Sequence, residues 1–61
     1  MADTVQVTHF RRADTYRVDL RDSGSVVALI ATGITDKSSA VQRAGSAAHI
    51  FGAPIVCEEV D

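Results

Sequence analysis

Four arginines in the first third of the chain have the residue type and spacing best suited to binding chemistry. Arg11 and Arg12 are adjacent, and Arg17 and Arg21 lie four residues apart on one alternating segment. Positions two or four apart in a strand share a face, and a hairpin could bring Arg11 or Arg12 beside Arg17 and Arg21. Such a set could bind nucleic-acid phosphates or a carboxylate patch on a protein. The alternative is a solvated sheet face whose arginines pair with nearby acids, namely Asp14, Asp19 and Asp22.

A second charged group stands at the C-terminus, where Glu58, Glu59 and Asp61 form an acidic edge. This edge either keeps a strand from pairing with other chains or mimics nucleic-acid charge toward a basic partner. Ile50 lies near Arg43 on the polar side of a predicted helix. One exposed isoleucine is ordinary, but this one would suit the centre of a small interface.

The histidines and the cysteine are too few and too scattered for a structural zinc site. We interpret His49 as a surface histidine and His9 as a half-buried histidine at the rim of a strand. Cys57 is interpreted as a small buried apolar residue, since the neighbouring Glu58 and Glu59 disfavour a thiolate.

An anion site at the predicted helix start is also disfavoured. Ser38 and Ser39 lie where free N–H groups could hold an anion, but the preceding segment lacks phosphate-loop spacing and Asp36 would repel a phosphate. We therefore predict no catalytic residue, no metal and no cofactor, and a protein that is not an enzyme.

One helix, from Asp36 to Gly52, organises the chain. Asp36 is a good N-cap, Gly52 suits the C′ position, and Pro54 prevents continuation. The apolar face recurs at helical spacing and is almost entirely small: Ala40, Val41, Ala44, Ala47, Ala48 and Phe51. Such a helix lies close to a sheet but buries little area, so the strands must supply the bulk.

Strand patterns cover Thr4–Arg11, Thr15–Arg21, Val26–Thr32 and a last segment that begins near Ile55. The second is the clearest, with Tyr16, Val18 and Leu20 inward and Arg17, Asp19 and Arg21 toward water. The third is apolar on both faces, so it is either covered on both sides or in contact with another chain.

These elements predict an α+β fold, with residues 1–61 forming a single domain of βββαβ order. The mostly antiparallel four-stranded sheet has one helix packed on one face, and the last strand can pair with the first or the third. The predicted core consists of Tyr16, Val18, Leu20, Leu29, Ala44, Ala48 and Phe51.

Size and composition narrow the class of protein further. A 61-residue domain buries only about 60% of its extended-chain surface. Without an internal disulfide or a zinc site, a good core or oligomerisation must stabilise the domain, and of these we favour a homodimer. The lone cysteine fits a reducing compartment. No signal peptide or membrane-length apolar run is present, which predicts a cytoplasmic protein without a membrane partner. The net charge of −2 argues against a dedicated nucleic-acid binder.

Two resemblances bear on function. The helix and last strand resemble those of short bacterial proteins of unknown function, through Thr35-Asp36-Lys37, Ala40-Val41, Arg43-Ala44, Ala48, Gly52-Ala53 and Ile55-Val56. The overall order, with Thr15-Tyr16-Arg17-Val18-Asp19-Leu20 ahead of an alanine-rich helix, also resembles small phage-encoded anti-CRISPR proteins. Those proteins bind a type I CRISPR effector complex and block target DNA recognition, which implies a non-enzymatic binder.

The leading functional prediction is a small protein-binding module, in its specific form a phage or mobile-element inhibitor of a CRISPR effector complex. It would act in the host cytoplasm through the charged sheet face or the acidic edge. The alternatives are a small dimeric nucleic-acid-binding protein that uses the arginine face, or an uncharacterised bacterial interaction module.

Overall fold

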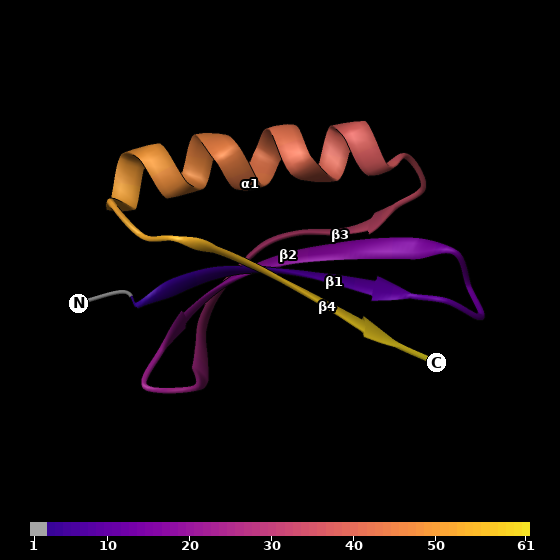
Figure 1. The fold of residues 1–61 in the computed structure, drawn as a ribbon, viewed down its shortest axis with the longest axis horizontal. Coiled ribbons are helices and arrows are strands. Elements are labelled where there is room, and N and C mark those ends of the chain that lie inside the picture. Colours follow the sequence, from indigo (N-terminus) through magenta and orange to yellow (C-terminus); the bar gives the residue numbers. More distant parts are fainter. Residues whose placement is uncertain (1–2) are drawn as a thin grey trace.

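The computed structural model describes residues 3–61, that is, all of the predicted domain except its first two residues. The elements follow the predicted order: β1 (Thr4–Phe10), β2 (Thr15–Asp22), β3 (Ser25–Ile34), α1 (Lys37–Phe51) and β4 (Ile55–Val60). Four strands form one sheet, and α1 lies along one of its faces (Figure 1). The α+β class and the βββαβ order are confirmed.

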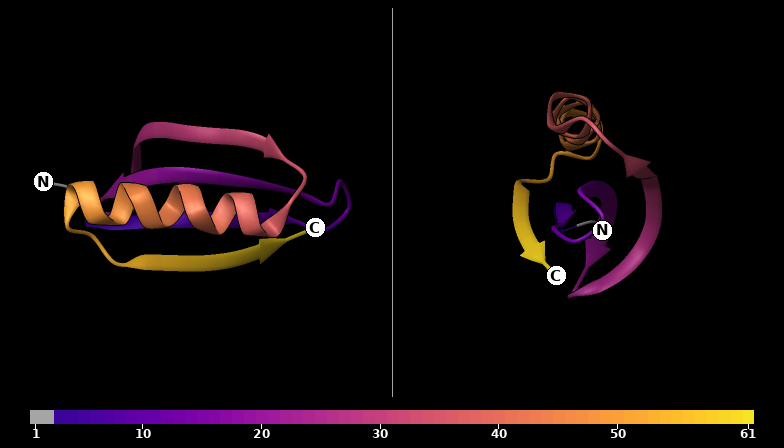
Figure 2. Two further views of the ribbon diagram at one scale, coloured as in Figure 1. Left: turned by 90° about the horizontal axis from the view of Figure 1, so that it is seen from above. Right: turned by 90° about the vertical axis from the view of Figure 1, so that its right-hand side faces the viewer.

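The sheet is mixed, with strand order β3-β2-β1-β4. β1 pairs antiparallel with β2, and β2 pairs antiparallel with β3. β4 returns beneath α1 and pairs parallel with β1, from Val5 opposite Ile55 to Phe10 opposite Val60. The last strand therefore pairs with the first rather than the third. β3 and β4 are the two edges, and they flank the central strands on opposite sides (Figure 2).

The ends of α1 are set by the residues that the sequence indicates. The Asp36 carboxylate accepts a hydrogen bond from the Ser39 backbone N–H at 3.2 Å, which satisfies one of the free donors of the first turn. Gly52 ends the helix with φ 64°, and its N–H donates to the Ala48 carbonyl. Only glycine takes that conformation without strain from a Cβ atom.

Valines and leucine from β1 and β2 meet alanines from α1 in the core. The buried apolar side chains are Val5, Val7, Val18, Leu20, Ala40, Ala44, Ala47 and Ala53. Tyr16 and Ala48 pack against them and are partly buried. Because the alanine side chains are small, α1 lies close to the two central strands. The same side chains do not reach far enough to cover the edge strands β3 and β4.

The prediction that Leu29 and Phe51 belong to the core is wrong, because Leu29 is 59% exposed and Phe51 is 50% exposed. β3 has register shifts along β2, so that Ala31 lies opposite Val18 while Leu29 lies opposite Asp19. The extra residue, Ile30, takes the α1 side, and Leu29 is left on the open face. Phe51 ends the last turn of α1 and lies beside the covered core.

The predicted burial of Cys57 is also wrong, because Cys57 is exposed. It lies opposite Val7 on β4, an edge strand that α1 does not fully cover. Phe10 lies opposite Thr15 at the end of the regular β1–β2 pairing. It is half-buried, with the Arg17 guanidinium 5.3 Å from its ring centroid.

Candidate functional site

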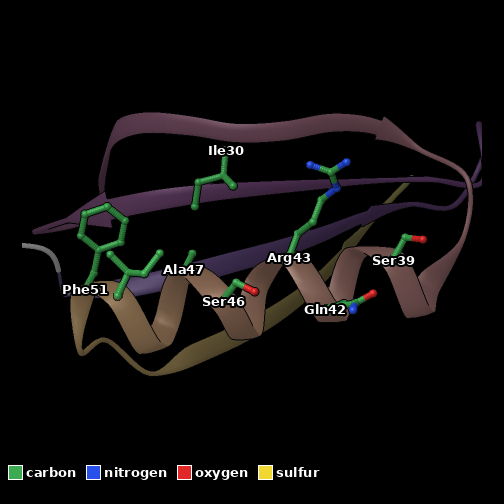
Figure 3. A pocket seen from close by; sticks show the side chains of 8 residues that line it. Ile30, Ser39, Gln42, Arg43, Ser46, Ala47 and Phe51 are labelled. Carbon is green, nitrogen blue, oxygen red and sulfur yellow. The ribbon is translucent and has the colours of Figure 1, made fainter.

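An open groove of about 580 Å³ runs between α1 and β3 (Figure 3). It exists because the alanine-rich helix sits close to the central strands while β3 lies to one side (Figure 2). Its lining comes from one stripe of α1 and from one residue of β3: Ile30, Ser39, Gln42, Arg43, Ser46, Ala47, Ile50 and Phe51.

The groove has an apolar end and a polar end. Ile50, which is 73% exposed, and Phe51 form the apolar end beside Ile30. The Arg43 side chain extends from α1 toward β3 (Figure 3). Within residues 3–61, Arg43 has no ion-pair or hydrogen-bond partner. An exposed isoleucine, an exposed phenylalanine and an arginine without a partner in the described residues thus line one groove.

The open face of the sheet carries a different cluster, centred on Asp19. Asp19 was predicted to point toward water, but it is 0% exposed. Its Oδ2 accepts from Arg17 Nε at 3.1 Å, and its Oδ1 accepts from Arg21 Nε at 3.0 Å. The two arginines share a face as predicted, and they form ion pairs with a carboxylate between them.

Polar side chains from β1 and β4 continue this cluster. Gln6 Nε2 donates to Glu58 Oε2 at 2.8 Å and to Thr8 Oγ1 at 3.3 Å. Gln6 and Thr8 are buried. No buried side-chain nitrogen or oxygen in the described part of the chain lacks a partner. Because buried polar groups need such partners to avoid a desolvation cost, this network is part of the fold.

The acidic edge is also engaged within the chain. Arg11 Nη2 lies 2.7 Å from Asp61 Oδ1, and Arg11 Nε lies 3.7 Å from Glu59 Oε2. These contacts are exposed, so each contributes little to stability. They nevertheless place one positive charge among the C-terminal acids.

His9 stacks on Tyr16 with ring centroids 4.4 Å apart. Its Nε2 lies 3.1 Å from Asp14 Oδ1, and its Nδ1 lies 3.9 Å from Glu59 Oε2. His9 is partly buried and His49 is exposed, as predicted. Within residues 3–61, no group of three or more metal-binding side chains comes together.

The predicted partner-binding residues therefore separate into four places. Arg43 and Ile50 line the groove, and Arg11 and Glu59 meet at the C-terminal edge. Arg17, Arg21 and Glu58 lie on the open face of the sheet, where the two arginines pair with Asp19 and Glu58 accepts a hydrogen bond from Gln6. Arg12 is exposed in the turn after β1. The four N-terminal arginines do not share one set of partners.

The sequence indicates two of the groove residues, Arg43 and Ile50, but not the groove itself. Ser39, Arg43, Ser46 and Ile50 recur at spacings of three or four, which places them on one helical stripe. This spacing can be recognised in the sequence. The contribution of Ile30 cannot, because it depends on a register shift in β3.

No protein family, curated protein or solved structure matches this chain. Within residues 3–61, no helix has both the length and the apolar character needed to cross a membrane.

Proposed function

We propose that the chain is a small non-enzymatic protein-binding module that contacts its partner through the groove between α1 and β3. The observation that carries this proposal is the grouping of exposed Ile50 and Phe51 with Arg43, which has no ion-pair partner within residues 3–61. Aromatic residues and arginine are enriched in the cores of protein interfaces, and a few such side chains supply most of the binding energy.

The free energy to be gained by binding a partner is larger at the groove than at the charged face of the sheet. Full burial of an isoleucine or phenylalanine side chain contributes about 1.5–3 kcal/mol, and that of Ile50 is still largely in water. Arg17 and Arg21 already bond to Asp19. A partner that bound these arginines would break their ion pairs with Asp19, and a carboxylate that loses its partners costs free energy.

The same pairing weighs against a nucleic-acid binder. Phosphate binding draws on arginines whose charge is not already neutralised. Arg17 and Arg21 share Asp19, and Arg11 lies among Glu59 and Asp61. The net charge of −2 adds long-range repulsion from a polyanion.

In its specific form, the proposal is that the partner is a type I CRISPR effector complex. The protein would be encoded by a phage or mobile element and act in the host cytoplasm. Occupation of the effector surface would block target DNA recognition. This form rests on the resemblance of the strand order and alanine-rich helix to small anti-CRISPR proteins.

The test is a binding and inhibition assay with purified type I effector complexes. The purified chain is titrated against each complex by biolayer interferometry, and target DNA binding is then measured with and without it. We expect saturable binding and loss of DNA binding. If the wild-type chain binds none of these complexes, the specific form is wrong.

Two helix variants locate the contact surface. Ile50→Lys places a charge in the groove, and Val41→Lys places the same charge at another exposed apolar position on α1, outside the groove. We expect Ile50→Lys to weaken binding at least about tenfold and Val41→Lys to leave it nearly unchanged. Equal losses in both variants would contradict a contact through the groove.

A further inference from the structure

The outer edge of β3 is open and unusually long. β3 has ten residues, whereas β4 has six. At about 3.3 Å per residue it spans roughly 33 Å, close to the longest extent of the molecule, 32 Å. Among the described residues, no strand pairs with the side of β3 that faces away from β2.

β3 lacks the charged residues and proline that usually protect an edge strand. Its sequence, SVVALIATGI, contains neither a charged residue nor a proline. Natural edge strands are commonly kept from pairing by lysines, other charges, proline or short length. The register shifts along β2 are the one protective feature present, and they twist the strand without placing a charge on it.

The exposed side chains of β3 are apolar. Val26, Val27 and Leu29 are each more than half exposed. Val26 lies opposite Arg21 and Leu29 opposite Asp19, so both stand on the open face of the sheet. A strand added alongside β3 would cover them with cross-strand neighbours, which is the ordinary way in which sheets gain stability.

We propose that two copies of this chain pair antiparallel through their β3 strands and join their sheets into one continuous sheet. A second copy suits this edge because both sides of the contact are uncharged, so self-pairing carries no like-charge penalty. Pairing of β4 with a second β4 would instead bring Glu58 and Glu59 toward their own copies. An uncharged strand is complementary to itself, as a two-fold interface requires.

This pairing has a geometric consequence for the groove. Antiparallel strands related by a two-fold axis perpendicular to the sheet keep the same face upward, so both α1 helices lie on one side. The two grooves then face each other across the paired β3 strands. The dimer is independent of the proposed function; only the use of the doubled groove by a partner would rest on it.

The test is the mass of the full-length chain in solution, measured by sedimentation equilibrium without any partner. We expect a reversible species of about twice the 6.5 kDa chain mass. Hydrogen exchange should show amides of β3 that become more protected as protein concentration rises. A 6.5 kDa species that persists at millimolar concentration would overturn the proposal.

A matched pair of lysine variants identifies the edge. Leu29→Lys and Val56→Lys each place one charge at an exposed apolar residue, the first on β3 and the second on β4. Leu29→Lys should weaken the dimer at least about tenfold, while Val56→Lys should change it little. Circular dichroism verifies that both variants are folded.

The other outcomes also decide the proposal. A dimer that survives Leu29→Lys, or one that Val56→Lys disrupts equally, would exclude β3 pairing and indicate β4 pairing or stacking of the open faces. A dimer lost on Ile50→Lys alone would assign the contact to the groove. Because no effector complex is present, failure here leaves the proposed protein-binding function untouched.

Discussion

The two faces of the sheet bury their side chains by different means. On the α1 face, Val5, Val18 and Ala44 are fully buried in an apolar core. On the other face, with no helix above it in residues 3–61, Asp19 is equally buried through its bonds to Arg17 and Arg21. The buried charge of the open face is satisfied by side chains of the same face, whereas on the α1 side Ile50 and Phe51 stay exposed beside an open groove.

Because of this difference, the residues that are free to bind a partner are not the ones that their types suggest. Arginines are the usual candidates for binding, yet Arg17 and Arg21 serve a buried carboxylate. Alanines are the usual filling of a core, yet their small size in α1 leaves Ile50 and Phe51 uncovered. Free binding capacity therefore lies where the packing is incomplete.

The largest expected effect comes from removing both arginines. Arg17→Ala with Arg21→Ala removes both ion pairs of Asp19 and the two side chains that cover its carboxylate. Breaking a buried ion pair costs up to about 3–5 kcal/mol, and water that reaches the uncovered carboxylate recovers part of that cost. In a domain this small, such a loss removes most of the stability. Urea unfolding followed by circular dichroism measures it.

The control adds Asp19→Ala to the double variant. With the carboxylate gone, the triple variant should recover part of the lost stability, because no unpaired charge remains. Wild-type stability in the double variant would mean that the arginines are free for a partner, and the contrast between the two faces would be lost.

The next effect tests the apolar face. Ala44 is fully buried against the sheet, so Ala44→Leu should overpack the contact and cost about 1–3 kcal/mol. For a domain of this size, each kcal/mol lowers the melting temperature by about 4–8 °C. Gln42→Leu, at an exposed position of α1, is the control. An unchanged melting temperature for Ala44→Leu would place α1 farther from the sheet.

A smaller effect is expected at the groove. Ile50 is 73% exposed, so Ile50→Lys should change the free energy of unfolding by no more than about 0.5 kcal/mol. A lysine in the last turn also interacts favourably with the helix dipole. Thermal unfolding checks this, and a large loss of stability would show that Ile50 belongs to the core.

The smallest signal is expected with DNA. Titration of short duplex and single-stranded DNA at two salt concentrations should show no binding tighter than about 100 μM at physiological salt. Micromolar binding that weakens steeply with salt would support the alternative of a nucleic-acid binder. Arg12→Ala, at an exposed arginine without a partner in residues 3–61, would then identify a contributing cation.

The helix and the first hairpins could be predicted because their signals are local. Asp36 and Gly52 cap α1, and Ser23 with Gly24 takes the positive φ angles of a two-residue turn. The inward face of Thr15–Arg21 follows from alternation alone. These features need no knowledge of the rest of the chain.

The errors arise where a local pattern leaves the environment undecided. A strand that is apolar on both faces does not indicate which face is inward, so Leu29 was placed in the core and Ile30 was missed. Cys57 was expected to be buried because the sequence does not show that β4 forms an edge. The burial of Asp19 depends on arginines two positions away on each side, a pattern that equally suits a solvated face.

Affinity for a purified type I effector complex, compared between a groove variant and an acidic-edge variant, tests the central claim most directly. Ile50→Lys changes the groove, and Glu58→Lys with Glu59→Lys changes the exposed acids of β4. We predict a loss of at least about tenfold for the groove variant and a change below about threefold for the edge variant. The reverse order would contradict the claim that the apolar groove makes the contact.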